Sequence, residues 1–325
     1  MQAGMSMIAS PAISSPAEIG PAPLLPQSRL VRFTLILGIA TVAVTFLWNS
    51  LHRTDWIGQL LGWNGVTAVA IVNLFFLALV VIYSTVRRDP LIVRAVIACL
   101  ILPSYAAAVN ILTFHAASLQ MPLLDATFAR WDAALGLDWP AFARWSADQP
   151  LIRTYGIHLY TYWYFLAPLI LILHAMAVKD IARLERIVGF IVVTGIITVI
   201  IGSLMPAASV FAHHGISDEF ARYLNSAVDA NYAKVYGAMR NSEPISLGDV
   251  AHGTVTFPSH HTLMGVAAIL FSMHSRRFAL LMVPPSLGMI FLTPTMGGHY
   301  FVDLIAGAAI AILCFLGINR LARAG

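Results

Sequence analysis

Long apolar runs separated by short polar segments make up most of the chain from residue 28 onward. A helix needs about 20 apolar residues to cross the hydrocarbon core of a bilayer. Eight segments are expected to cross as helices, roughly 30–51, 65–86, 91–112, 154–178, 187–206, 259–275, 278–294 and 299–319. The sixth and seventh are short, and Pro284-Pro285 is expected to kink the seventh. The pattern therefore predicts an all-α fold, a polytopic membrane helix bundle.

Three segments fall outside this pattern. Residues 1–27 are rich in Pro, Ala, Ser and Gly, which predicts a disordered tail ahead of a membrane-embedded domain over 28–325. Residues 122–150 mix tryptophans and phenylalanines with acids and arginines, which favours an amphipathic helix in the membrane interface. A solvated loop with scattered aromatics is the alternative for that segment. Residues 207–258 are expected to form a long outer loop.

Composition supports the membrane assignment. The chain is 59% hydrophobic and 10% charged, whereas a soluble domain carries about 25% charged residues. Its net charge of +4 reports membrane topology, so we expect the bilayer and no nucleic acid as a partner. Its two cysteines lie inside apolar runs, which excludes a disulfide framework and a thiolate metal site.

The basic residues predict an orientation, because short cytoplasmic loops are enriched in Lys and Arg. With the N-terminus inside, the short inner segments hold Arg29, Arg32, Arg87, Arg88, Arg94, Lys179, Arg183, Arg186, Arg276, Arg277, Arg320 and Arg323. The outer segments are much longer and hold fewer. Both termini are therefore expected in the cytoplasm, and the starts of the sixth and eighth spans at the extracytoplasmic face.

Asp303 is the only acid expected inside a span, where a carboxylate is costly and usually has a partner. It follows His299 by four residues, so the two side chains are expected on one helical face. The carboxylate then binds one ring nitrogen and leaves the other as a lone pair, which predicts a nucleophilic histidine. A buried pair that only joins two helices is the alternative.

A second histidine pair begins the sixth span. Pro258 is expected in the first turn of its helix, with Thr256 or Ser259 as the cap. Free N–H groups at the starts of the sixth and eighth spans then offer two anion sites, and Gly298 allows a close approach of backbone to ligand. With His261 as a proton donor, these groups predict phosphoryl transfer at the outer membrane edge.

A zinc site is the competing interpretation, since two or three histidines with an aspartate suit that metal. However, an HExxH motif is absent, and His260 and His261 point in different directions on a helix. We therefore expect no metal and no other cofactor.

These residues resemble the motifs of the type 2 phosphatidic acid phosphatase superfamily. Its second motif, Pro-Ser-Gly-His, is similar to Pro258-Ser259-His260-His261, with histidine in place of glycine. His299 and Asp303 match the end of its third motif, Ser-Arg-x5-His-x3-Asp, but Leu292 and Thr293 replace Ser-Arg. Its first motif, Lys-x6-Arg-Pro, has only a partial counterpart from Lys234 to Arg240, with one residue too few and Asn241 in place of proline.

The resemblance implies a catalytic mechanism without a metal. His299 attacks phosphorus to form a phosphohistidine, and Asp303 orients it. His261 protonates the leaving alcohol and then activates the acceptor. The expected contacts to the substrate phosphate come from Ser259, His260, Gly298, Arg240 and Lys234. For the two cations, ordinary solvated loop charges are the alternative.

The missing third-motif arginine favours a phosphodiester, which carries one negative charge and two free oxygens. The pattern is similar to the branch with fungal inositol phosphorylceramide synthase and sphingomyelin synthase. It implies transfer of a phospho-headgroup from a phospholipid donor to a lipid alcohol, with residues 122–150 as a lid. A lipid phosphate phosphatase, with water as acceptor, is the second hypothesis. A transporter or structural membrane protein is the third.

Overall fold

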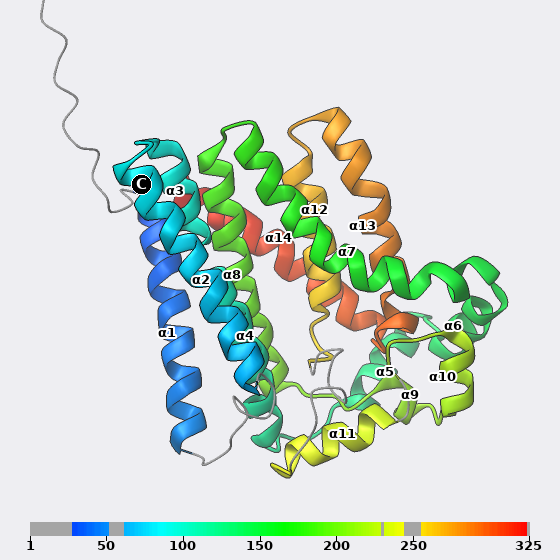
Figure 1. Ribbon diagram of the computed structural model, residues 1–325. Helices are drawn as coiled ribbons and strands as arrows, with labels where there is room; N and C mark the ends of the chain where they lie inside the picture. The colour runs from blue at the N-terminus through cyan, green and yellow to red at the C-terminus, as the bar shows by residue number, and fades with distance from the viewer. Residues whose placement is uncertain (1–27, 52–61, 229–230, 244–254, 324–325) are drawn as a thin grey trace, which may run out of the picture.

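The computed structural model describes residues 28–51, 62–228, 231–243 and 255–323 (Figure 1). All regular secondary structure in these ranges is helical, which confirms the predicted all-α fold. The tail at residues 1–27 lies outside the described residues.

Within the described ranges, seven helical segments are long and apolar enough to cross a membrane. They are α1 (Arg29–Leu51), α2 (Gly62–Thr85), α3 (Pro90–Cys99) with α4 (Leu102–Ser118), α7 (Pro150–Ala177), α8 (Ile181–Leu204), α13 (Arg276–Met296) and α14 (Phe301–Arg323). The predicted sixth span corresponds to α12 (His260–Ser272), which is apolar but has only 13 residues. At about 1.5 Å per residue this helix is roughly 20 Å long, too short to cross a bilayer alone.

Local sequence signals explain where these helices begin. Asp89 caps α3 by accepting the N–H groups of Leu91 and Ile92, with Pro90 as the first helical residue. Asp180 caps α8 in the same way, so this helix begins six residues before the predicted start. α13 runs as a single helix through Pro284 and Pro285, so these prolines do not end it.

The earlier start of α8 corrects one prediction. Glu185 now lies within a spanning helix, so Asp303 is not the only acid there. Glu185 is buried and accepts a hydrogen bond of 2.9 Å from the guanidinium of Arg94 on α3. The pairing satisfies a carboxylate that would otherwise be costly to bury.

The two segments predicted outside the bundle also contain helices. Residues 122–150 fold as two helices and not one, α5 (Asp125–Ala134) and α6 (Trp139–Asp148). They are separated at Gly136, whose φ of +74° lies in the left-handed region that favours glycine. The segment 207–258 contains α9 (Val210–His213), α10 (Asp218–Leu224) and α11 (Asn231–Arg240).

Figure 1 shows these short helices together at one end of the bundle. At the opposite end, α1 begins, α14 ends, and the short α2–α3, α7–α8 and α12–α13 connections lie. The N-terminal end of α12 stops well inside the bundle, above the level at which α1 and α4 end. The first residues of α12 are therefore set back into the bundle, and the layer of short helices lies between them and that end of the molecule.

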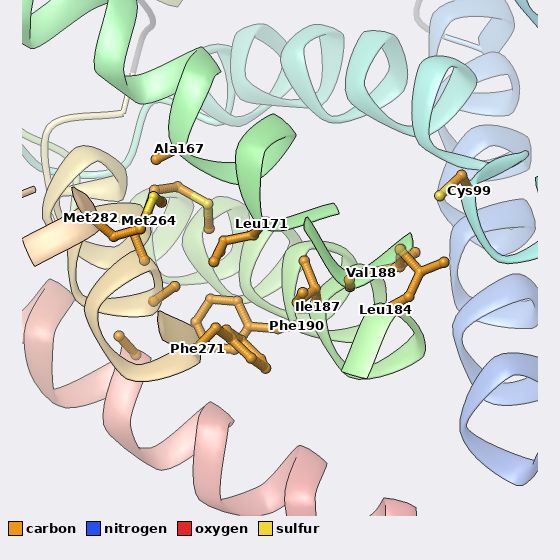
Figure 2. Packing of buried hydrophobic residues seen from close by; sticks show 14 of the residues in the cluster. Cys99, Ala167, Leu171, Leu184, Ile187, Val188, Phe190, Met264, Phe271 and Met282 are labelled. Atoms are coloured by element: carbon orange, nitrogen blue, oxygen red, sulfur yellow. The ribbon is translucent and has the colours of Figure 1, made fainter. Parts of the chain in front are cut away.

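α8 packs against α1, α3, α4, α7, α12 and α14, and so lies at the centre of the bundle. Figure 2 shows Phe190 of α8 against Phe271 and Met264 of α12 and Leu171 of α7. Apolar side chains from three helices thus fill the core between the start of α12 and the end of the bundle where the two termini lie.

α14 approaches the start of α12 closely at Gly307. A Cβ atom built on Gly307 of α14 would lie only 2.5 Å from the backbone carbonyl oxygen of Ser259. Because backbone cannot move aside as a flexible side chain can, only glycine fits at this position.

We therefore expect Gly307→Ala to push α14 away from the start of α12. Overpacking of this kind typically costs about 1–3 kcal/mol. Thermal unfolding of the purified protein in detergent measures the loss. Gly317→Ala is the matched control on the same helix, because a Cβ there meets nothing within 4 Å. Equal melting temperatures for the two variants would contradict the close approach.

Candidate active site

Ser259 positions the start of α12. Its side-chain oxygen accepts the N–H of Thr262 at 3.3 Å, which makes it the N-cap. Of the two predicted caps, Ser259 is thus correct, while the Thr256 hydroxyl donates to the carbonyl of Ala207. Pro258 precedes the cap, so its predicted place in the first turn is wrong.

The backbone joins this helix start to α14. The N–H of Ser259 donates to the carbonyl oxygen of Asp303 at 3.0 Å, next to the close approach at Gly307. Two segments about forty residues apart in sequence therefore meet at the same depth, as the sequence predicted.

His299 and Asp303 form the predicted pair. Nδ1 of His299 lies 3.2 Å from Oδ2 of Asp303, and both side chains are buried. The prediction placed both residues within one helix, a turn apart. α14 begins only at Phe301, so His299 precedes the helix and the contact crosses the helix start. The N–H of Tyr300 donates to the same oxygen at 2.9 Å. The carboxylate occupies Nδ1, so Nε2 of His299 is the atom left for chemistry.

The hydroxyl of Tyr160 places His261 near this pair. The Tyr160 hydroxyl lies against Gly297, where a Cβ would overlap that hydroxyl and would lie 2.9 Å from Cδ2 of His299. The Tyr160 hydroxyl is 3.0 Å from Nδ1 of His261, and that of Tyr164 is 2.8 Å from Nδ1 of His260. Neither tyrosine was predicted from the sequence, because aromatic residues four apart in an apolar run resemble ordinary core positions.

A family model described as the PAP2 superfamily matches residues 126–317, more than half of the chain. The chain belongs to the PAP2 superfamily. This confirms the resemblance to the type 2 phosphatidic acid phosphatase superfamily and supports a lipid enzyme of the phosphatase or phosphotransferase type. The match covers α5 to most of α14, and α1 to α4 lie outside it. No curated protein and no solved structure matches the chain significantly.

In this PAP2 protein the start of α14 is not a free anion site. The buried carboxylate of Asp132, on α5, accepts the N–H groups of Phe301 and Val302, each at 2.8 Å. This corrects the prediction of two anion-binding helix starts, because Asp132 already occupies one of them. Burial raises the pKa of Asp132 above its ordinary value, and the two N–H donors oppose that shift.

The start of α12 remains available. In the described part of the chain, no acceptor takes the backbone N–H of His260 or His261. Gly298 has a left-handed φ of +67°, and a Cβ there would lie 3.2 Å from Val228 and 3.5 Å from Phe211. Its conformation thus serves packing against the outer loop, and its predicted contact with phosphate stays a prediction.

The segment 122–150 holds the loop that carries His299. Nε1 of Trp139, a buried side chain on α6, donates to the carbonyl oxygens of His299 and Pro294 at 3.1 and 3.2 Å. Asp125 on α5 accepts the Tyr300 hydroxyl at 2.9 Å. These roles were not predicted from the sequence, although Asp125 and Asp132 are seven residues apart and therefore share one face of a helix.

The two predicted phosphate cations lie on α11. The guanidinium of Arg240 donates to the carbonyl of Met121 at 2.9 Å, and Lys234 is exposed. α11 packs against α4 through Val235, Tyr236 and Met239. Among the described residues, no hydrogen bond joins either cation to the histidines, so their roles also stay predictions.

No group of three or more His, Cys, Asp or Glu side chains among the described residues is placed to hold a metal ion. The metal-free mechanism remains an expectation of the motifs.

Asp132→Asn tests the support of the loop that carries His299. The asparagine amide keeps one acceptor oxygen but turns an NH2 group toward the second backbone N–H. α14 therefore loses one of its two capping hydrogen bonds and the negative charge at its N-terminus. The loss of a cap costs about 0.5–2 kcal/mol, and we expect lower thermal stability together with reduced turnover. Asp148→Asn is the control, because Asp148 is an exposed residue on α6. The same melting temperature in both variants would contradict the cap.

Proposed function

We propose that this PAP2 protein transfers a phospho-headgroup from a phospholipid donor to a lipid alcohol through a phosphohistidine on His299. The observation that carries this proposal is the pairing of Nδ1 of His299 with a buried carboxylate, which leaves Nε2 free beside His261. A carboxylate partner fixes the tautomer of the ring and raises the basicity of its free nitrogen.

The reaction has two proton-balanced halves. Nε2 of His299 bonds to phosphorus while the bond from phosphorus to the diacylglycerol oxygen breaks. Nε2–H of protonated His261 supplies the proton for that leaving oxygen. The acceptor alcohol then gives its proton to Nε2 of His261, its oxygen bonds to phosphorus, and the bond to His299 breaks. Asp303 stabilises the positive charge on His299 during both halves.

The phosphate oxygens are proposed to lie at the start of α12. The free N–H groups of His260 and His261 suit an anion. Ser259 contributes by capping α12, which fixes the point where the helix begins and these N–H groups are exposed. Gly298, Arg240 and Lys234 complete the proposed contacts to the phosphate or headgroup.

The residue at the third-motif arginine position supports a phosphodiester. That position holds Thr293, which is buried and donates its hydroxyl to the carbonyl of Met289 in its own helix. A phosphodiester has one charge to compensate, and a monoester dianion has two. The proposed branch is therefore the one that resembles inositol phosphorylceramide synthase and sphingomyelin synthase. A lipid phosphatase is the second candidate, because PAP2 membership supports either type.

The recessed position of the histidines favours transfer over hydrolysis. Trp139 and Asp132 fix the segment 122–150 against the loop of His299, and this cover limits the access of water. We propose that it shields the phosphohistidine while a lipid alcohol enters from the bilayer. Arginines gather at the end of the bundle where α1 begins and α14 ends. Their position supports a cytoplasmic location for both termini and an extracytoplasmic active site.

A donor and acceptor screen tests the reaction type. We expect the purified full-length protein in detergent micelles to release diacylglycerol from a phosphodiester lipid only when ceramide or a long-chain alcohol is present. Labelled phosphatidylinositol, phosphatidylcholine and phosphatidic acid are the donors, and the products are separated by chromatography. Release of inorganic phosphate from phosphatidic acid without an acceptor would instead establish the phosphatase.

Substitution of the nucleophile tests the chemistry. We expect His299→Ala and Asp303→Asn each to lower turnover more than about 1,000-fold, because members of a catalytic triad act as a unit. A rapid alkaline quench of the wild-type enzyme with labelled donor should trap an acid-labile phosphoprotein that His299→Ala lacks. His158→Ala is the control, since His158 is an exposed residue of α7. Wild-type turnover in His299→Ala would overturn the mechanism.

A further inference from the structure

Two tyrosines on one face of α7 are paired with the two adjacent histidines of α12. Tyr160 and Tyr164 are four residues apart, so their side chains lie one helical turn from each other. Each hydroxyl is hydrogen-bonded to Nδ1 of one histidine, at 3.0 Å for Tyr160 with His261 and 2.8 Å for Tyr164 with His260. Both imidazoles therefore have only Nε2 left for a ligand.

Ring packing fixes the orientation of His261 as well. The Tyr160 ring stacks on it with centroids 3.9 Å apart and an angle of 13°, and the Tyr164 ring lies 4.3 Å away. Two phenol rings thus hold one imidazole, and Tyr160 is itself buried. Such contacts limit the rotation of His261 and keep Nε2 aimed away from α7.

The partners of the two catalytic histidines differ in charge. Asp303 is a carboxylate, which stabilises the imidazolium of His299 and makes that ring the stronger base and nucleophile. Tyr160 is a neutral hydroxyl that accepts or donates a hydrogen bond, so it stabilises the imidazolium of His261 less. The ring with the weaker partner gives up its proton more readily.

We propose that Tyr160 is the positioning residue that makes His261 the acid and base of the reaction. This inference rests on the proposed function. Tyr160 accepts the Nδ1–H of His261 in both halves of the cycle and keeps its own proton. Nε2 gives its proton to the leaving oxygen and takes one from the acceptor alcohol.

Tyr164 has the complementary task at His260. It donates to Nδ1 of His260, so Nε2 of that ring carries a proton as a donor. In the described part of the chain, this buried Nε2 has no hydrogen-bond partner. A phosphate oxygen of the substrate is the acceptor that we assign to it.

The other titratable groups around His261 are few. Tyr160 and Tyr164 face it from α7, His260 precedes it on α12, and His299 with Asp303 behind it faces it from the start of α14. Among the described residues, the bond from Tyr160 is the only hydrogen bond between these groups and the ring of His261. Removing the Tyr160 hydroxyl therefore removes that bond, while the pair of His299 and Asp303 stays intact.

Tyr160→Phe tests the assignment while it keeps the stacked ring. We expect kcat to fall about 10- to 100-fold, the loss of one hydrogen bond to a charged group. The imidazolium of His261 loses its acceptor and gives up its proton more readily. Because His261 must be protonated yet is the weaker base of the two histidines, its titration sets the acid limb of the pH profile of kcat/KM, and that limb shifts to lower pH. The alkaline limb, which is set by the titration of His299 as the stronger base, stays in place. Tyr162→Phe, an exposed tyrosine on the same helix, should match wild type.

The leaving group provides a second measurement. p-Nitrophenolate leaves without a proton, so cleavage of p-nitrophenyl phosphate or p-nitrophenyl phosphocholine should fall much less in Tyr160→Phe than lipid turnover. Unchanged lipid turnover in a folded Tyr160→Phe protein would overturn the proposal. A reduced rate with an unmoved acid limb would overturn it too, because that is the signature of a purely structural role. His299→Ala is assayed alongside. An active His299→Ala protein would mean that the proposed function itself fails, whereas an inactive one confines the failure to the role of Tyr160.

Discussion

Asp303 joins the two halves of the candidate site through two different atoms. Its carboxylate binds the ring of His299 and the N–H of Tyr300, while its backbone carbonyl accepts the N–H of Ser259 at the start of α12. A buried carboxylate is tolerated only where such donors compensate it. The same residue therefore orients His299, the proposed nucleophile, and fixes the helix that carries His261. Gly307 extends this junction, because the two helices meet there backbone to backbone.

The layer of short helices is part of this construction and not only a cover. Asp132 and Trp139 bind the backbone on both sides of Tyr300, and Asp125 binds its hydroxyl. Hydrogen bonds to buried carboxylates are strong, and their donors would be left unpaired if α5 moved away. The part of the segment that contacts the loop of His299 is thus fixed. Any opening for a substrate then falls to other parts of the layer or to the sides of the helices.

The sequence predicted the long elements well and the short ones poorly, for physical reasons. A span is visible because some twenty apolar residues have no other explanation, so seven segments were found. α12 was predicted as a span, but it has only 13 residues and its start is bonded to α7 and α14. The pair of His299 and Asp303 was visible because a carboxylate in an apolar run is unusual. Tyr160 was not, because only the fold shows that an aromatic in a span faces an imidazole. Asp132 was missed because its partners, the N–H groups of α14, carry no sequence signal.

Electrostatics near Asp303 constrains which substrate the site accepts. The carboxylate already places a negative charge in a buried site, and its Oδ1 has no hydrogen-bond partner in the described structure. The repulsion between a substrate phosphate and this charge doubles when the phosphate goes from one charge to two, and low dielectric magnifies the difference. Classical members of the superfamily compensate it with an arginine, but here that position is Thr293, bonded to its own helix. The groups that remain at the helix start are neutral dipoles and histidines. Such groups suffice for a monoanion more readily than for a dianion, which is why the charge balance of the described residues favours a phosphodiester.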